Sequence, residues 1–288
     1  MTITQTIPDQ ITVRQPATLE CCLSSYAITR VSYDEANALR KQPERLAGNL
    51  SYSVLRHLDE QTMACMAATG AAIQKYEGRP ENFDRWGVVT SSRYLGRASF
   101  IQNLDKFSKE GPWNVSIQVV PNRSLHSPAS TVGFALGCHG PCVGVGGGRD
   151  GETDAWISAV SLLEHHKLQG VWVVFCGWEP DELVDMEGKA INNAECTALA
   201  VALTPSSMEG PLARLRIEFD ASAPGRLEVP MKATVLSQFE KSISSDSEGQ
   251  PLTIQLGGSL KTVVEWAPAE ITTISLPEQP AIMPKKVA

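Results

Sequence analysis

An uninterrupted apolar run at residues 170–179, GVWVVFCGWE, constrains the fold of this chain more than any other stretch. A run of this length without polar alternation is typical of a strand that is covered on both faces. Such strands belong to sheets that carry helices on both sides, and the rest of the chain alternates between strand-like and helix-like segments. The sequence therefore predicts an α/β fold in which a sheet lies between layers of helices.

The other elements are predicted from hydrophobic periodicity and from their boundary residues. Further strands are expected at 20–28, 85–92, 142–145, 196–205 and 212–220. Helices are expected at 58–78, 94–107, 127–137 and 151–166. Beyond about Asp220 the pattern changes, and 252–266 reads as a hairpin that turns at Gly257 and Gly258. The expected division is a polar leader at 1–18, a main domain at 19–222, an extension with the hairpin at 223–275 and a flexible tail at 276–288.

Composition excludes several classes of function. The chain has 288 residues and a formal net charge of −7, and its Lys and Arg residues form no cluster of the kind that nucleic acid requires. No stretch approaches about 18 uninterrupted apolar residues, so no membrane span is expected. The first 17 residues lack the apolar segment of a signal peptide, which favours a cytoplasmic protein. None of the seven cysteines has CxxC or zinc-ligand spacing, so we expect reduced thiols and neither a metal nor a cofactor.

A glycine-rich joint at residues 142–160, CVGVGGGRDGETDAWISAV, connects a predicted strand to a predicted helix. Such joints often build sites, yet this one contains Arg149 and has no Cys or Ser from Val143 to Ala155. One interpretation is a dinucleotide site, because Gly146, Gly148 and Gly151 spell GxGxxG. That fingerprint normally opens its domain and is followed by an acidic residue some 20 positions later, and neither condition is met here.

The acidic start of the helix after this joint also counts against a pyrophosphate. Asp150, Glu152 and Asp154 would repel it, whereas they suit the positive end of a helix dipole. A second interpretation is purely structural: the glycines let a buried helix pack closely on the sheet, and nothing binds. The residues alone leave this structural interpretation open.

From residue 86 to 179, about a third of the chain, the sequence resembles the β-ketoacyl synthases of the thiolase superfamily. The resemblance rests on several short motifs whose spacing needs no gap from Gly87 to the helix after Gly151. These motifs are GVVTSS (87–92), SFIQN (99–103), GPWNVSIQVVPN (111–122), FALGCHGP (134–141) and VWVVFCGWE (171–179). They resemble the family's early strand, its tunnel segment, the approach to its interface helix, its G-x-x-GP turn and its strand ending in Gly-Gly-x-Glu. The resemblance implies a thiolase-like α/β fold of helix–sheet–helix layers with a mixed sheet, in which the N-terminal ketosynthase half is followed by a short divergent hairpin region.

In that family a cysteine at the N-terminus of a buried helix takes up the acyl chain. On the ungapped spacing the nucleophile turn consists of Gly146, Gly147, Gly148, Arg149 and Asp150, and the cysteine position falls on Arg149. A guanidinium stays protonated and cannot be a nucleophile, so no catalytic residue is expected. Fewer than about 70 residues follow Asp220, with no histidine among them, so the family's two catalytic histidines and lysine are missing as well.

The resemblance therefore implies a non-catalytic subunit similar to the chain length factors of type II polyketide synthases. Its partner would be an active ketosynthase in a heterodimer, and an acyl carrier protein would dock on that partner. The interface would contain the helix 127–137 and the strand residues Cys142, Val143, Gly144 and Val145. Phe100 and Phe134 would lie beside the acyl tunnel. Arg149 would fill the vacated pocket and pair with Asp150, Glu152 or Asp154, because a buried arginine needs a carboxylate partner.

Two alternatives remain beside this hypothesis. The first is a homodimeric scaffold or binding protein of the same fold that holds an acyl or carboxylate ligand at Arg149. The second is an acyltransferase that uses a displaced cysteine, Cys138 or Cys142. Neither cysteine is expected at a helix N-terminus, so a structural role is favoured for both.

Overall fold

One eight-stranded sheet organises the part of the chain that the structure describes. The computed structural model describes residues 18–115, 117, 119–146, 151–179, 194–219, 234–244, 251–257 and 260–267. The strand order is β3-β2-β4-β5-β1-β6-β8-β7. The strands are β1 (Leu19–Ser32), β2 (Trp86–Ser92), β3 (Cys142–Val145), β4 (Gly170–Glu179), β5 (Glu195–Pro205), β6 (Ala213–Phe219), β7 (Leu252–Gly257) and β8 (Leu260–Trp266).

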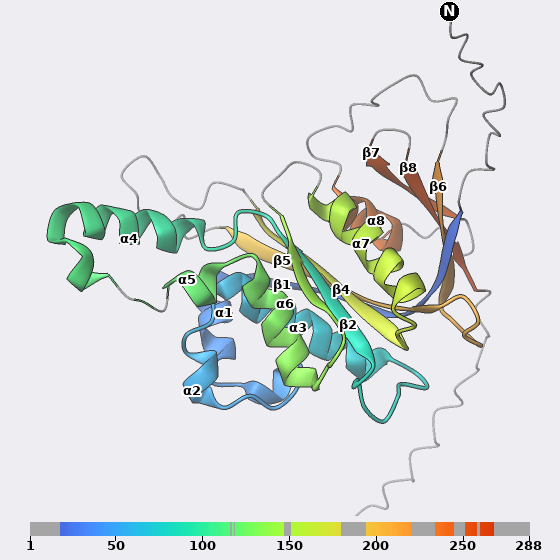
Figure 1. The fold of residues 1–288 in the computed structure, drawn as a ribbon, viewed down its shortest axis with the longest axis horizontal. Coiled ribbons are helices and arrows are strands. Elements are labelled where there is room, and N and C mark those ends of the chain that lie inside the picture. Colours follow the sequence, from blue (N-terminus) through green and yellow to red (C-terminus); the bar gives the residue numbers. More distant parts are fainter. Residues whose placement is uncertain are drawn as a thin grey trace, which may run out of the picture.

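Helices cover both faces of this sheet (Figure 1). One face carries α1 (Tyr33–Leu39), α3 (Glu60–Lys75) and α6 (His126–Leu136), and the other carries α7 (Gly151–His165) and α8 (Val235–Ser244). The shorter helices are η1 (Pro43–Arg45), α2 (Tyr52–Leu55), η2 (Pro112–Asn114) and α5 (Val119–Arg123). The remaining helix, α4 (Arg97–Glu110), extends away from the sheet. The predicted layering of helix, sheet and helix is confirmed.

Strand β4 is covered on both faces, as its apolar run predicts. Trp172, Val174 and Cys176 belong to the core on the α3 side. Val171, Val173 and Phe175 belong to the core on the α7 side. β4 runs parallel to β2 and antiparallel to β5, while β3 pairs with β2 in parallel. The sheet is therefore mixed, as expected.

The C-terminal hairpin forms as predicted but also continues the main sheet. β7 and β8 pair antiparallel, and β8 pairs along its length with β6, from Ala213 with Trp266 to Phe219 with Leu260. The expected turn residue Gly258 lies outside the described residues. Helix α8 was not predicted; Val235, Leu236 and Phe239 on it are buried. The proposed domain boundary at 222/223 stays a prediction.

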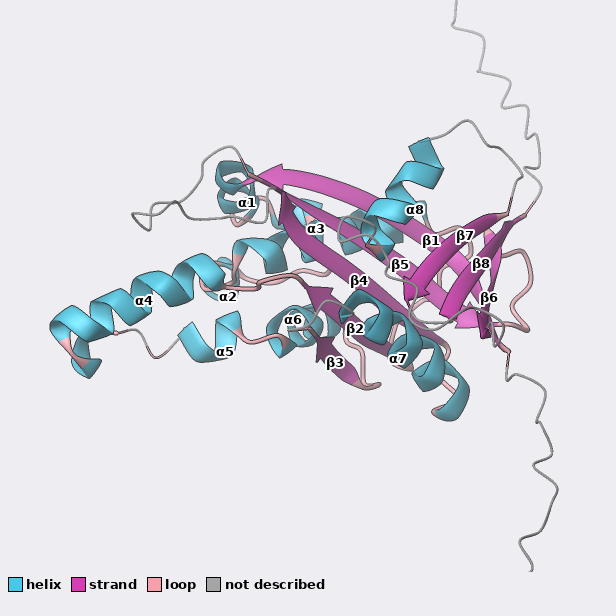
Figure 2. Ribbon diagram, turned by 90° about the horizontal axis from the view of Figure 1, so that it is seen from above, coloured by secondary structure: helices cyan, strands magenta, loops and turns pink. Residues whose placement is uncertain are grey.

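Helix α4 and the short helix η2 form an arm that protrudes from the body, which is also clear from above (Figure 2). The helix begins at Arg97 and ends at Glu110, whereas 94–107 was expected. Gly96 precedes it with a φ of 68° and Gly111 follows it with a φ of 82°, so both ends use glycine where the backbone is left-handed. Among the described residues, no helix combines the length and the apolar character needed to cross a membrane.

Candidate functional site

The candidate site lies where the parallel strands β2, β3 and β4 end. Ser91 pairs with Val145 and Ser92 with Cys176, so the three carboxyl ends lie side by side. Helix α7 begins immediately after this edge. A Cβ on Gly151 would stand 3.3 Å from the Cα of Gly146 and 3.4 Å from the Oγ of Ser91. The glycine joint therefore brings the start of α7 against the strand ends, and the predicted strand and helix on either side of it are confirmed.

The centre of the predicted nucleophile turn is not part of the described chain. Gly147, Gly148, Arg149 and Asp150 lie outside the described residues. The assignment of Arg149 to the nucleophile position, and its pairing with carboxylates, stay predictions. What the structure does define is the first turn of α7, which follows directly.

Glu152 in this first turn is bonded to the C-terminal part of the chain. Its Oε2 accepts a hydrogen bond from the backbone N–H of Leu236, at 2.9 Å, in the first turn of α8. Its neighbour Thr153 donates its hydroxyl to the backbone carbonyl of Leu256 on β7. The first turn of α7 is thus held to both α8 and β7.

Burial raises the pKa of Glu152, and the N–H of Leu236 and the charge of Arg93 oppose that rise. Glu152 acts as a carboxylate cap for α8, since an anion is favoured near the exposed N–H groups of a helix start. Asp154, also expected as a partner of Arg149, is exposed at the surface.

Arg93 is a site residue that the sequence did not single out. It directly follows β2, and its Nε lies 3.8 Å from Oε1 of Glu152. Its Nη2 lies 3.6 Å from Oε1 of Glu179 at the end of β4. A Cβ on Gly177 would stand 2.6 Å from the Arg93 Nε, so that glycine leaves room for the guanidinium. The sequence signal that could have identified Arg93 is its position directly after a predicted buried strand.

A second buried carboxylate, Asp59, lies before α3. Its Oδ1 caps the helix by accepting the N–H of Gln61 at 2.7 Å, and its Oδ2 lies 3.7 Å from the Nε of Arg123. Burial raises the pKa of Asp59 to about 6; the neighbouring charge of Glu60 adds to the rise and Arg123 opposes it. Gln61 in turn donates to the carbonyl of Arg93 at 2.8 Å, which connects Asp59 and α3 to the strand ends.

Cys138 and Cys142, the two cysteines considered as displaced nucleophiles, both have a raised pKa. All seven lie within the described residues, and none forms a disulfide. Burial raises the pKa of Cys138 to about 12 and also raises the pKa of Cys142. Cys138 follows α6 and Cys142 begins β3, so neither lies at a helix N-terminus. These thiols favour the protonated form, whereas a nucleophilic cysteine needs a lowered pKa.

Metal chemistry finds no support in the described ranges. Within them, no group of three or more His, Cys, Asp or Glu side chains is placed to hold an ion. His165 ends α7, and its Nδ1 lies 2.9 Å from the carbonyl of Ser161, so it interacts with the last turn of its own helix.

The expected tunnel and interface residues lie on one side of the molecule. Cys142, Val143, Gly144 and Val145 form β3, which is the edge strand of the sheet and is half-buried along its length. Phe134 on α6 is 73% exposed, so this chain does not enclose it. Phe100 lies half-buried near the base of the α4 arm. Their roles at a tunnel and an interface stay predictions.

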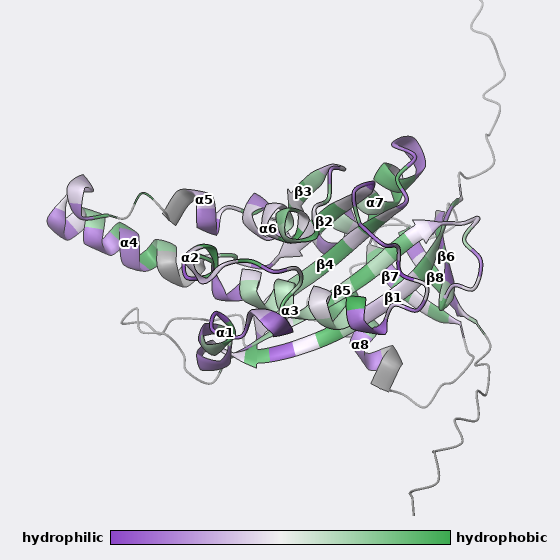
Figure 3. Ribbon diagram, turned by 90° about the horizontal axis from the view of Figure 1, so that it is seen from below, coloured by the Kyte–Doolittle hydropathy of each residue, from purple (hydrophilic) through white to green (hydrophobic). Residues whose placement is uncertain are grey.

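Large apolar side chains are exposed along the protruding arm. In Figure 3, α4 carries hydrophobic positions among its hydrophilic ones. Leu104 and Phe107 on α4 are 66% and 53% exposed. Beyond it, Trp113 is 96% and Ile117 is 86% exposed. We call these four residues the arm patch. Exposed apolar groups of this kind are typical of protein–protein contacts.

Comparison with solved structures identifies the fold. A ketosynthase in complex with its chain length factor from Xenorhabdus doucetiae matches with a TM-score of 0.53 and 14% sequence identity. That match covers 86% of this chain and 99% of the other. A type II polyketide synthase acyl-carrier protein in complex with its ketosynthase, bound to the hexaketide, matches with a TM-score of 0.51 and 8% identity, over 71% of this chain and 70% of the other. Neither a protein-family model nor a curated protein matches the sequence. The chain has the thiolase-like fold of the ketosynthases.

Proposed function

We propose that this chain is a non-catalytic, ketosynthase-like subunit that pairs with an active ketosynthase and helps to shape its acyl tunnel. The observation that carries the proposal is the state of the first turn of α7. No Cys or Ser occurs from Val143 to Ala155, and Glu152 and Thr153 are bonded to α8 and β7. A catalytic turn must instead present a nucleophile to an open pocket.

The match to a solved complex supports the same proposal. The match to the ketosynthase and chain length factor complex covers 99% of the solved chain and 86% of this one. A partner with a complete site would have to perform the condensation.

A pairing surface is available for such a partner. β3 is an edge strand, and an edge presents backbone N–H and C=O groups that a strand of another subunit can bind. Phe134 lies exposed on α6, which packs against β3, and the arm patch lies exposed on the protruding arm. Binding a second subunit would bury these apolar groups, and the acyl tunnel would then be enclosed between the two chains.

Co-expression with an active type II ketosynthase tests the proposal. We expect a one-to-one complex in size-exclusion chromatography with light scattering, and elongation of malonyl units on a carrier protein by that complex only. Elongation by this chain alone would overturn the proposal. A homodimer that persists unchanged beside every ketosynthase tried would favour the alternative of a homodimeric scaffold.

The length of the product tests the role in the tunnel. Phe100→Ala removes a ring at the base of the arm, and the complex should then release longer products, detected by mass spectrometry. Tyr52→Ala, at an exposed aromatic residue on α2 outside the arm patch, is the matched control and should leave product length unchanged. Unchanged products from Phe100→Ala would remove the tunnel role from Phe100 without affecting the pairing.

A further inference from the structure

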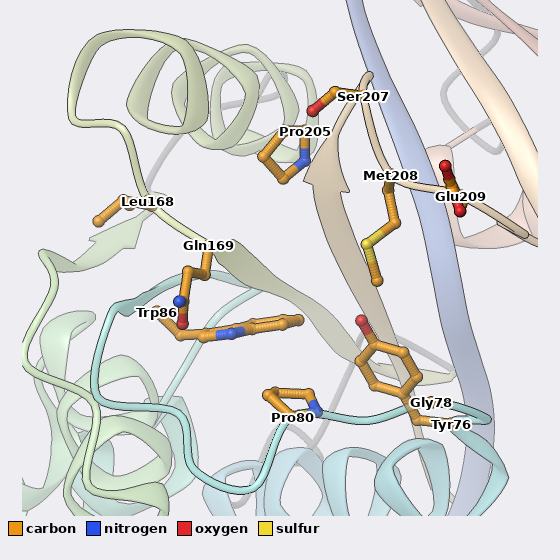
Figure 4. Close-up of a pocket in the computed structure, with 10 residues that line it drawn as sticks. All are labelled: Tyr76, Gly78, Pro80, Trp86, Leu168, Gln169, Pro205, Ser207, Met208 and Glu209. Carbon is orange, nitrogen blue, oxygen red and sulfur yellow. The ribbon is translucent and has the colours of Figure 1, made fainter.

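A hollow of about 430 Å³ lies where β2 and β4 begin, but its floor is part of the core (Figure 4). Trp86 and Tyr76, which line it, are only 1% and 5% exposed, and both belong to the cluster on the α3 side of the sheet. The hollow therefore presents little aromatic surface to a ligand. The edge of the sheet at β7 is the stronger candidate for a further contact.

Strand β7 is the edge of the sheet opposite to β3. Its six residues, LTIQLG, contain neither a charge nor a proline. An edge of this composition is a template for pairing with another chain, and natural proteins protect such edges with charges, prolines, bulges or covering elements. The strand itself supplies only a register shift between Gln255 and Gly257, near its end. Further protection must come from elements outside β7.

Helix α8 supplies this protection through Gln238. The Nε2 of Gln238 donates to the backbone carbonyl of Gln255 at 3.0 Å, and its Oε1 accepts the backbone N–H of Gln255 at 2.9 Å. A glutamine carboxamide carries the same kinds of donor and acceptor as a peptide group, so Gln238 takes the place that a residue of a further strand would occupy. The hydroxyl of Thr153 on α7 occupies the next carbonyl of β7, that of Leu256.

The packing of α8 holds Gln238 at this edge. Phe239, the next residue, is fully buried, and its ring meets those of Tyr26 and Trp266 edge-on, with centroids 5.5 and 6.2 Å apart. Because the helix is fixed in this way, the two bonds to Gln255 require little additional ordering.

We propose that Gln238 closes the β7 edge, and that an opened β7 pairs antiparallel with β7 of a second copy of this chain. Alternate residues of an edge strand direct their N–H and C=O groups outward, so Thr253 shares the outward direction of Gln255. Two copies of one strand are self-complementary about a two-fold axis, which is why a second copy fits this edge.

The closed edge also limits assembly. If an active ketosynthase binds at β3, a step that rests on the proposed function, the sheet cannot be extended further at β7 and growth stops at one partner. The closure of β7 itself does not depend on that function, and it is tested on this chain alone.

Gln238→Ala opens the edge. In sedimentation velocity over a range of concentrations, this variant should self-associate roughly tenfold or more tightly than the unmodified chain, because pairing adds several backbone hydrogen bonds. At a concentration below association, the Gln255 amide should exchange its hydrogen faster than in the unmodified chain. Lys241→Ala, at an exposed position of the same helix, is the matched control and should associate like the unmodified chain. Unchanged self-association of a folded Gln238→Ala variant would overturn the proposal.

A second substitution assigns the contact to β7. Thr253→Lys, at an exposed position, brings like charges together where two copies of β7 would pair. Gln238→Ala combined with Thr253→Lys should therefore return to the mass of the unmodified chain. Self-association that survives the lysine would contradict pairing through β7. If Gln238→Ala does not unfold cooperatively, Gln238→Met, which keeps the length of the side chain without its hydrogen bonds, replaces it with the same expected results.

Discussion

Glu152 combines two features that rarely coincide in one carboxylate. It lies in the first turn of α7, where its negative charge interacts favourably with the positive end of the helix dipole. It also accepts a hydrogen bond from the backbone N–H of Leu236 in α8. It is buried, and the Nε of Arg93 lies 3.8 Å from its Oε1. One side chain therefore connects the strand ends, the start of α7 and the C-terminal helix.

Glu152→Ala should lower the free energy of unfolding by about 1–3 kcal/mol, because it leaves a buried N–H of α8 without its acceptor. Chemical denaturation measures the loss of unfolding free energy. In hydrogen exchange, the exchange rate of the Leu236 amide should increase more than that of any other amide. Asp154→Ala, in the same turn but exposed, should change stability by no more than about 0.5 kcal/mol. Equal effects of the two substitutions would show that the contact to α8 contributes nothing.

Asp59 gives stability a pH dependence of a defined sign. Its pKa rises from 3.8 to about 6 in the folded chain because of burial, so the folded state binds this proton more tightly than the unfolded state does. The contribution of Asp59 to stability is therefore present below pH 4 and is lost as the pH rises to about 6, at up to about 1.4 kcal/mol per pH unit.

Asp59→Asn keeps a side-chain acceptor for the N–H of Gln61 and removes the titration. The difference in unfolding free energy between the variant and the unmodified chain should shift in favour of Asn between pH 4 and pH 6, then stay level above pH 7. Urea denaturation across that pH range provides the measurement. A difference that is independent of pH would show that Asp59 does not titrate as its burial requires.

Sequence patterns found part of this chemistry and missed the rest for a physical reason. The cysteines were expected to be structural, and burial raises the pKa of both Cys138 and Cys142. Arg93 and Asp59 were missed because their partners are far away in the sequence. Arg93 meets Glu152 and Glu179 only once β2, β4 and α7 have been brought together. The prediction for Arg149 remains to be tested, since that residue is not described.

At the scale of elements, the α4 arm is the part of the described chain where we propose that a partner binds, because the arm patch is exposed there. Burying a large apolar side chain stabilises an interface by about 1.5–3 kcal/mol. Trp113→Ser combined with Ile117→Ser should therefore raise the dissociation constant of the complex with an active ketosynthase by tenfold or more. Surface plasmon resonance with the immobilised partner measures this constant. The stability of the isolated chain should not change, because both side chains are exposed.

Tyr52→Ser is the matched control for the arm. Tyr52 is 56% exposed on α2, outside the arm patch, so its loss should leave partner affinity intact. If the arm variants and this control behave alike, the patch is not part of the interface and β3 alone must account for any pairing.

The sequence predicts an element best when the pattern that defines it lies within the residues of that element. β4 and α7 were placed almost to the residue, because an apolar run and an amphipathic pattern with a glycine start are contained in the segments themselves. Helix α8 was missed although its own segment carries a local signal, since Val235, Leu236 and Phe239 recur at helical spacing and are all buried. The order of strands in the sheet depends on contacts between distant segments and was not contained in any local pattern.

At the scale of the whole molecule, α8, β7 and β8 contribute buried residues to the core on the α7 side of the sheet. Phe239 of α8, Ile254 of β7 and Val264 of β8 are all fully buried, in the same cluster as Trp156 of α7. α8 and the hairpin cover the α7 face of the sheet.

A truncation measures how much this cover contributes. A chain that ends at residue 219 keeps most of the proposed 19–222 domain but loses α8, β7 and β8. Each buried large apolar residue that is lost costs about 1.5–3 kcal/mol, and several such losses exceed the roughly 5–15 kcal/mol that stabilise a typical domain. We expect this truncated chain to bind the dye ANS and to lose its near-ultraviolet circular dichroism.

A chain that ends at residue 267 is the control for this truncation, because it keeps every described C-terminal element. It should unfold cooperatively at the same temperature as the full chain. If the chain ending at 219 instead unfolds cooperatively at that temperature, α8 and the hairpin are an appendage and 19–222 folds by itself. If it binds ANS and loses its near-ultraviolet circular dichroism, the hydrogen bonds from Glu152 and Thr153 to α8 and β7 join two parts of one folding unit. The contacts of the first turn of α7 with α8 and β7 are then required for the stability of the core.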